Sequence, residues 1–168
     1  MVMLLLSAAC AQSPSAKEYQ VKAAFLYNFA KFVEWPASSF SDAAAPLRIC
    51  VYGQDPFGPA LHDIANDKSI NGRKLEVDQV VDVPHARSCH ILFIASSEKT
   101  SVQQILEGLR GAGVLTVADS KGFVGQGGMI NFVLEDDRVK FEVSPAAAER
   151  AGLKISSKLL SVAKLVVG

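Results

Sequence analysis

The sequence predicts a single α/β domain of three-layer type, in which helices flank a mixed β-sheet with a parallel core and a C-terminal antiparallel hairpin. Three observations support this prediction. Short apolar runs alternate with segments of helical periodicity through the first two thirds of the chain. Two segments of alternating polarity then flank Asp136 and Asp137, a pattern typical of a hairpin. The length of 168 residues is enough for one sizeable core.

The first helix is expected to start near Tyr19 and to stop at Trp35–Pro36, because proline disfavours helix in the residue before it. Its predicted core-facing stripe has apolar residues at helical spacing: Val21, Phe25, Phe29 and Phe32. Lys22 is expected on another face. A buried strand is predicted at LRICVYG (47–53), followed by a second helix with Asp55 as N-cap and Pro56 in its first position.

The next elements are expected to complete the parallel part of the sheet. Strands are predicted at GRKLEVDQVV (72–81), HILFIA (90–95) and VLTVAD (114–119). The helix between the last two has an apolar face formed by Val102, Ile105, Leu106 and Leu109. The serines at 96–97 are interpreted mainly as a cap for this helix, with ligand contact beyond the strand end as the alternative.

The last third is expected to hold the hairpin and two helices. The hairpin is predicted over MINFVLEDDRVKFEV (129–143). A short helix follows, with Ser144 as N-cap and Gly152 at its end, and SSKLLSVAKLVV (156–167) is predicted as a terminal helix. This last segment is more apolar than one buried stripe requires, so part of it is expected to be exposed or to lie in a dimer interface.

The N-terminus is expected to direct export. Residues 1–11 resemble the end of a signal peptide truncated at its start, with Ala9-Cys10-Ala11 fitting the cleavage pattern. Cys10 also permits a lipoprotein form, and an ordinary cytosolic N-terminus is a further alternative. Removing Cys10 leaves Cys50 and Cys89, an even number that favours a disulfide between neighbouring strands in an oxidising compartment, against two buried free thiols.

Charge and motifs argue against several classes of function. Seventeen basic residues balance seventeen acidic ones, so no basic face for nucleic acid is expected. The three histidines lack metal-ligand spacing, and no nucleophile elbow is present, so neither a metal site nor catalysis is predicted, and no cofactor. A small-ligand pocket beyond the strand ends, near Gly53, Gln54 and Ser96, remains as an alternative function.

Several segments together resemble the YfiR family of periplasmic regulators. They run from about residue 18 to the C-terminus (the domain is set at 18–168): KAAFLYNFAKFVEWP, ICVYGQDPFG, NGRKLEV, CHILFIASSE, LTVADSKGF, GGMINFVLEDDRVKFEV and AAAERAGLKISSKLLSVAKLV. The resemblance implies a non-enzymatic, homodimeric repressor of a YfiN-like inner-membrane diguanylate cyclase, which lowers cyclic di-GMP and opposes biofilm formation. It also implies a YfiB-like outer-membrane lipoprotein as a further partner. Cys50 and Cys89 match a disulfide of the family, whereas the second cysteine pair of some members is absent.

Partner contacts are expected on two surfaces. Tyr27 and Trp35 lie off the main stripe of the first helix and are candidates because such side chains combine an apolar ring with a polar group. The other surface is the apolar C-terminal segment, represented by Leu165 and Val166. Its expected polar rim consists of Glu142, Glu149 and Arg150.

Overall fold

The structure is a computed structural model that describes residues 16–167. The expected signal peptide at 1–11, the candidate lipidation site Cys10 and the terminal Gly168 therefore lie outside the described residues. Within residues 16–167, no helix has the length and apolar character needed to cross a membrane.

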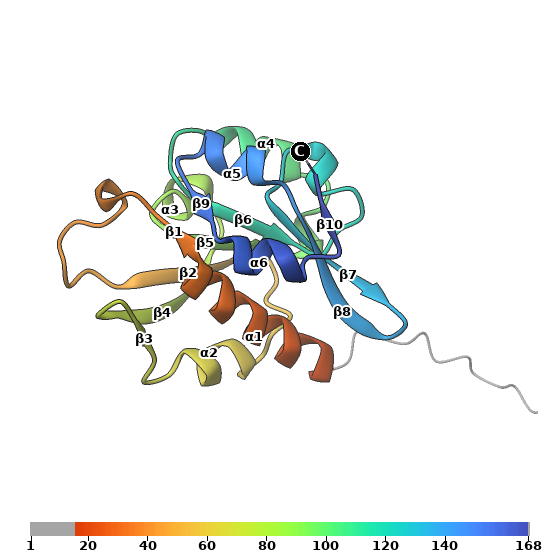
Figure 1. The fold of residues 1–168 in the computed structure, drawn as a ribbon, viewed down its shortest axis with the longest axis horizontal. Coiled ribbons are helices and arrows are strands. Elements are labelled where there is room, and N and C mark those ends of the chain that lie inside the picture. The colour runs from red at the N-terminus through yellow and green to blue at the C-terminus, as the bar shows by residue number, and fades with distance from the viewer. Residues whose placement is uncertain (1–15, 168) are drawn as a thin grey trace, which may run out of the picture.

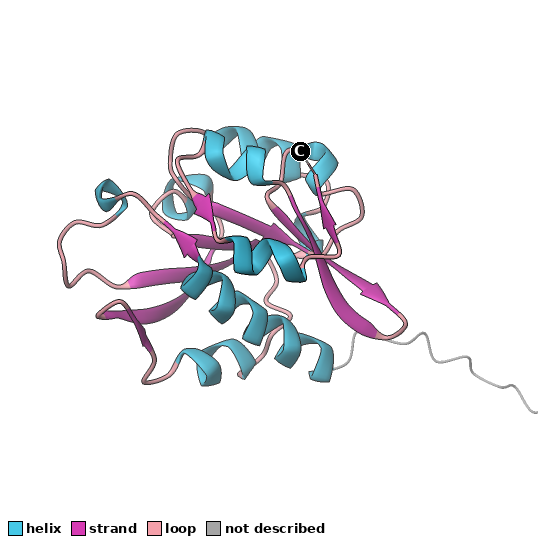
Figure 2. Ribbon diagram, in the orientation of Figure 1, coloured by secondary structure: helices cyan, strands magenta, loops and turns pink. Residues whose placement is uncertain are grey.

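One mixed sheet forms the centre of the molecule (Figures 1 and 2). Its strand order is β10-β8-β7-β6-β5-β2-β4-β3. The strands have these bounds: β2 Leu47–Tyr52, β3 Ser69–Ile70, β4 Arg73–Val80, β5 Ile91–Ile94, β6 Leu115–Ala118, β7 Ile130–Glu135, β8 Arg138–Val143 and β10 Leu165–Val166. Pairing is parallel from β4 through β2, β5 and β6 to β7, whereas β7 and β8 are antiparallel. The predicted parallel core with a C-terminal hairpin is confirmed.

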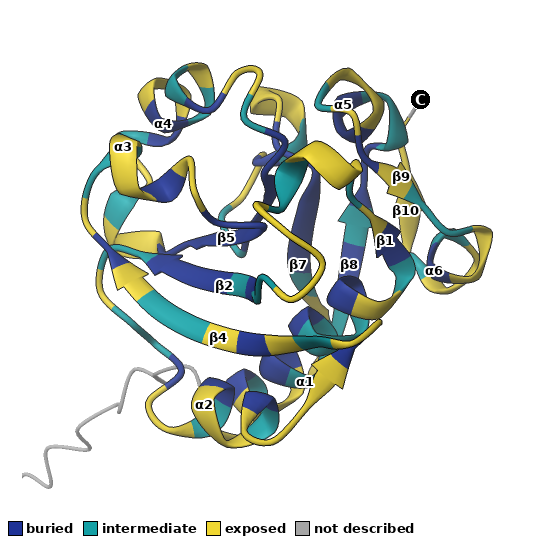
Figure 3. Ribbon diagram, turned by 90° about the vertical axis from the view of Figure 1, so that its left-hand side faces the viewer, coloured by how far each residue is buried: buried dark blue, intermediate teal, exposed yellow. Residues whose placement is uncertain are grey.

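Helices cover both faces of this sheet, and each face has its own buried cluster (Figure 3). The helices have these bounds: α1 Ala16–Phe32, α2 Ala60–Ala65, α3 Val83–Ala86, α4 Val102–Gly108, α5 Pro145–Arg150 and α6 Ser157–Val162. Residues of α1, α2, α5 and α6 belong to the larger cluster, and residues of α3 and α4 to the smaller. A separate two-stranded sheet pairs β1 (Val33–Glu34) with β9 (Lys154–Ile155).

The buried stripe of α1 is rotated from the predicted one. Phe29 is buried as expected and packs on Phe132 and Phe141, but Val21 is exposed and Phe25 and Phe32 are only half-buried. The buried positions are Tyr19, Lys22, Ala23, Leu26, Phe29 and Ala30. The prediction that Lys22 lies on another face is therefore wrong. Lys22 is buried because the carboxylate of Asp119, from a distant segment, compensates its charge. The helix also begins before Tyr19 and ends before Trp35.

Two further helix boundaries differ from the prediction. α2 begins at Ala60, because the Asp55 carboxylate accepts a hydrogen bond from the backbone of Phe57 and closes a turn, so it does not cap the helix. α4 begins at Val102, and neither serine of 96–97 caps it. The cap predicted at Ser144 is confirmed, since its hydroxyl accepts a backbone hydrogen bond from Ala147. Ser156 caps α6 in the same way, through the backbone N–H of Lys158.

The terminal helix is shorter than predicted. α6 ends at Val162, and Leu165–Val166 form the edge strand β10, parallel to β8. This strand covers the outer backbone edge of β8, which would otherwise present unpaired N–H and C=O groups. Lys164 fixes its start: the backbone N–H donates to Phe141 O at 2.8 Å, and the ammonium lies 2.6 Å from Glu135. The prediction of a helix through Leu165 and Val166 is wrong.

Candidate functional site

The residues expected to bind a ligand meet at the carboxyl ends of β2 and β5. The backbone N–H of Gln54 donates to the Ser97 hydroxyl at 3.0 Å and so joins the two strand ends. Gly53 has a φ of +93°, and a Cβ there would lie 2.7 Å from the same hydroxyl, so glycine is required. Ser96 is exposed beside this contact. A hydrogen bond between loops thus accounts for Ser97, in place of the predicted helix cap.

Ser96 also lines a cavity of about 460 Å³, whereas Gly53 and Gln54, the other residues named for the predicted pocket, do not line it. The cavity lies beyond the end of β6, beside the part of β7 that extends past it. The N-terminal turns of α1 form another wall. Its polar lining includes Lys22, Asp119 and Asn131, and its apolar lining includes Phe132 and Leu134. Besides Ser96, a sequence signal for this site is the position of Asp119, directly after a buried parallel strand.

A buried ionic cluster forms the polar side of the cavity. The Lys22 ammonium lies 2.8 Å from Asp119 Oδ2 and 3.5 Å from Glu18 Oε2. The Tyr19 hydroxyl donates to the same Asp119 oxygen at 2.8 Å. Burial, followed by this hydrogen bond, raises the pKa of the Tyr19 phenol far above its ordinary value, so it stays a donor. The cluster joins α1 to the end of β6 and orients Asp119.

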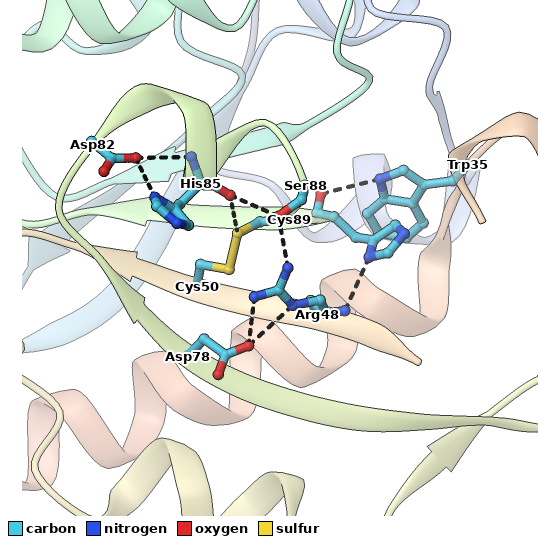
Figure 4. Close-up of a disulfide and its surroundings, with 9 residues drawn as sticks. Trp35, Arg48, Cys50, Asp78, Asp82, His85, Ser88 and Cys89 are labelled. Atoms are coloured by element: carbon cyan, nitrogen blue, oxygen red, sulfur yellow. Dashed lines mark hydrogen bonds and ion pairs between the residues drawn. A yellow bond between two sulfur atoms is a disulfide. The ribbon is translucent and has the colours of Figure 1, made fainter. Parts of the chain in front are cut away.

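The disulfide joins β2 to the segment before β5 (Figure 4). Cys50 and Cys89 are bonded, with their Cα atoms 6.1 Å apart, and both are buried in the smaller cluster. Arg48, two residues before Cys50, donates twice to Asp78 Oδ2 on β4 and once to the Ser88 hydroxyl. The bond therefore lies in a region where three chain segments are already held together, and the prediction of a Cys50–Cys89 pair is matched by the structure.

Next to Cys89, His90 is buried at the amino end of β5. Its Nδ1 faces the backbone N–H of Arg48 at 3.0 Å, and its Nε2 lies 2.9 Å from Ser39 O. Since a backbone N–H is always a donor, Nδ1 accepts and Nε2 carries the hydrogen. Burial lowers the pKa of His90, so the ring is neutral at pH 7.

The two aromatic candidates for partner contact are both half-buried. Trp35 uses its polar group internally: Nε1 donates to His90 O at 3.1 Å, and the indole meets the His90 ring edge to face (Figure 4). Tyr27 packs against the larger core cluster, with the Lys31 ammonium 5.6 Å from its ring centre. Each therefore has a structural role, and neither presents a free ring to solvent.

The C-terminal candidates form an edge of the sheet. Leu165 and Val166 are 50% and 46% exposed, and Leu165 is in register with Glu142 of β8. Glu149 and Arg150 are exposed at the end of α5, and Figures 1 and 3 place the end of the chain beside that helix. The structure thus places Leu165 and Val166 beside Glu142 and Val143 of β8, two residues before the start of α5.

No cluster of three or more His, Cys, Asp or Glu suited to a metal ion is found in the part of the chain that the structure describes. The model of a family described as YfiR/HmsC-like matches residues 19–164. No curated protein shows significant similarity to the chain.

Two solved structures resemble this fold, each at 10% sequence identity. A conserved domain protein of Vibrio cholerae has a TM-score of 0.56, and the match covers 89% of this chain and 60% of that one. An ABC domain of Streptococcus pneumoniae, solved in complex with L-Trp, has a TM-score of 0.51, with 72% of this chain and 55% of that one covered. At this identity the likeness concerns the fold alone, and the chain spans less than two thirds of either protein.

Proposed function

Because the chain belongs to the YfiR/HmsC-like family, we propose that it is a periplasmic regulatory binding protein that represses an inner-membrane diguanylate cyclase. In this role it contacts the periplasmic sensory domain of a YfiN-like cyclase, lowers cyclic di-GMP and opposes biofilm formation. The role is non-enzymatic. A YfiB-like outer-membrane lipoprotein and a second copy of the chain are the further partners that the family suggests.

The observation that carries this proposal is the exposed apolar edge at β10. Val162, Leu165, Val166 and Val167 are all exposed, although they follow one another in a short segment with defined structure. Contiguous apolar side chains on a small domain are typical of interaction surfaces, above all when charged residues surround them. Glu142 is in register with Leu165, and we propose that it forms such a rim together with the exposed Glu149 and Arg150 of α5. Tyr27 and Trp35 rank second as contact residues, because their rings are already packed.

Deletion of the gene in its host tests the proposal. Cyclic di-GMP is measured in the wild type, in the deletion strain, and in deletion strains that express either the wild-type chain or Val166→Asp. We expect the deletion to raise cyclic di-GMP, the wild-type chain to restore the original level and Val166→Asp to fail. An unchanged level in the deletion strain would contradict repression of a cyclase by this chain.

A small-ligand sensor that acts on another membrane partner is the second candidate function. It is favoured by one observation: Ser96, beyond β5, lines a cavity with buried polar groups at the carboxyl ends of parallel strands. Open α/β sheets commonly bind ligands at that end. Gly53 and Gln54 adjoin this region through the contact with Ser97, so they shape the loop that carries Ser96 and support the site indirectly.

A further inference from the structure

The loop at 36–46, between β1 and β2, is attached to the rest of the molecule by two side chains. None of its residues is buried. Among the described residues, its hydrogen bonds to other segments involve only His90 and Arg73. His90 Nε2 donates to Ser39 O at 2.9 Å, and the Arg73 guanidinium donates to two further carbonyls of the loop. A segment with so few buried contacts can open locally at a low cost in free energy.

Stacked rings strengthen the same two attachments. Phe40 is the only aromatic residue of the loop, and it is half-buried. Its ring stacks on the His90 imidazole with 4.4 Å between ring centres, and Arg73 Cζ lies 3.6 Å from the centre of the Phe40 ring. A displacement of the His90 ring would therefore disturb both the stack and the hydrogen bond to Ser39.

The His90 ring lies between a fixed partner and this loop. Its Nδ1 accepts a hydrogen bond from the backbone N–H of Arg48 at 3.0 Å. Arg48 belongs to β2, which is paired with a strand on each side, so its backbone cannot move without disrupting the sheet. A second proton on the ring would bind at Nδ1 and place two N–H donors face to face. Since β2 is fixed and the loop is not, the protonated ring would be displaced against the loop.

The charged groups around His90 oppose a second proton. Arg48 on β2 and Arg73 on β4 are both positive, and the Asp78 carboxylate is bound by the Arg48 guanidinium. The two aromatic rings packed on the imidazole carry no charge. Within the part of the chain that the structure describes, no carboxylate hydrogen-bonds to the ring, so an imidazolium has no directly bonded negative partner.

These contacts determine the direction of the response to pH. Burial lowers the pKa of His90 and the two guanidinium charges lower it further, although the hydrogen bond to Ser39 O has the opposite effect. When the loop is open the ring is hydrated, and its pKa returns toward about 6.5. The open form therefore takes up the proton first, and acid shifts the equilibrium toward it.

From this geometry we propose that the loop at 36–46 is a pH-responsive cover, which opens when His90 takes up a second proton at Nδ1. In neutral solution the ring keeps both backbone hydrogen bonds and the loop stays closed. Below about pH 6.5 the ratio of open to closed molecules should rise by up to about tenfold per pH unit. Opening exposes the ring face that Phe40 covers. The inference goes beyond both proposed functions and depends on neither.

NMR spectroscopy of the purified, isotope-labelled chain with its disulfide intact tests this proposal from about pH 7.5 to about pH 4.5. The ring proton signals of the three histidines give each titration midpoint. The heteronuclear NOE of each amide measures backbone mobility on the picosecond to nanosecond timescale. We expect the NOE of the loop amides to fall with the same midpoint as the His90 ring, below about pH 6.5. The NOE of the β5 and β6 amides should stay high, because the opening is local.

Variants separate this mechanism from the titration of a merely buried histidine. Ala43 and Ala44 are exposed, and neither side chain is bonded to His90. Glycine gives the open loop more conformational freedom, so in Ala43→Gly/Ala44→Gly both midpoints should rise together by about one pH unit. In His90→Gln the loop should lose its pH dependence, whatever its mobility at neutral pH. His62→Gln, at an exposed histidine, should behave like the wild type.

The proposal is overturned if the His90 ring titrates while the loop stays rigid. It is also overturned if the ring stays neutral and the loop rigid down to the pH at which the whole chain unfolds. An unchanged His90 midpoint in the double glycine variant would contradict it too, because the loop and the proton would then not be coupled. Cyclic di-GMP in the deletion strain, which tests the regulator function, enters none of these measurements.

Discussion

The imidazole Nδ1 of His90 accepts a hydrogen bond from the backbone N–H of Arg48, with 3.0 Å between the two nitrogens. The other ring nitrogen donates to Ser39 O, so the neutral ring uses both of its nitrogens. The Phe40 ring stacks on the imidazole at 4.4 Å between ring centres. A second proton on the ring would face an N–H group inside the protein.

The first prediction is that the chain loses stability as the pH falls below about 6.5. Burial lowers the pKa of His90 in the folded state, so the unfolded chain takes up the proton first. The free energy of unfolding should therefore decrease between the unfolded pKa and the lower folded pKa, by at most about 1.4 kcal/mol per pH unit from this residue. Urea denaturation at several pH values measures the slope. In His90→Gln the free energy of unfolding should change less steeply with pH. An equal slope in the variant would show that groups other than His90 cause the pH dependence.

The second prediction concerns the disulfide. Cys50 and Cys89 are 39 residues apart, and on the chain-entropy model a loop of this size stabilises the folded state by about 4 kcal/mol. Reducing the wild type should lower the free energy of unfolding in urea titrations. The double substitution Cys50→Ala/Cys89→Ala should lower it by a similar amount. The double variant should no longer respond to a reductant. Equal stability of the oxidised and reduced wild type would contradict a stabilising role for this bond.

The third prediction concerns the ion pair between Lys22 and Asp119. Removing one partner of a buried pair leaves an uncompensated charge, which typically costs about 3–5 kcal/mol. We expect Lys22→Met or Asp119→Asn alone to destabilise strongly, and the double variant to lose clearly less than the sum of the two. A double-mutant cycle by chemical denaturation gives the coupling energy. Additive losses would show that the two groups do not stabilise each other.

The sequence predicted the sheet well because its strands are defined locally. The run at 91–94 is wholly apolar, the segments around Asp136 and Asp137 alternate, and both turn residues have positive φ, as a tight hairpin requires. The order of these elements then restricts the topology to a mostly parallel sheet. Local patterns of this kind do not depend on distant parts of the chain.

The candidate site could not be predicted in the same way. Helical periodicity assigns a lysine to solvent, but Lys22 is buried because Asp119, 97 residues later in the chain, lies beside it. Asn131 occupies a buried position of a mostly apolar strand, and it lines a cavity only because β6 ends beside it and α1 lies nearby. Leu165 and Val166 likewise continue a helical pattern in the sequence. They form a strand because the edge of β8 offers backbone hydrogen bonds to them.

The last prediction concerns the partner surface at β10. Successive residues of a strand point to opposite sides of the sheet, so Leu165 and Val166 probe its two faces separately. Each is replaced by Asp in turn, and Val81→Asp serves as the control because Val81 is exposed outside this surface. All three variants should keep a free energy of unfolding within about 0.5 kcal/mol of the wild type, as is usual for surface substitutions.

Val166→Asp should then fail to repress, and Leu165→Asp should fail as well if both faces of β10 contact the cyclase. Val81→Asp should repress like the wild type. A buried carboxylate at the centre of an apolar contact is strongly unfavourable without a partner charge, so the deletion strain expressing the affected variant should keep high cyclic di-GMP. Size-exclusion chromatography with light scattering of the same variants separates loss of a homodimer from loss of contact with the cyclase. If both β10 variants are stable and repress fully, the contact lies elsewhere, and Tyr27 and Trp35 become the next positions to test.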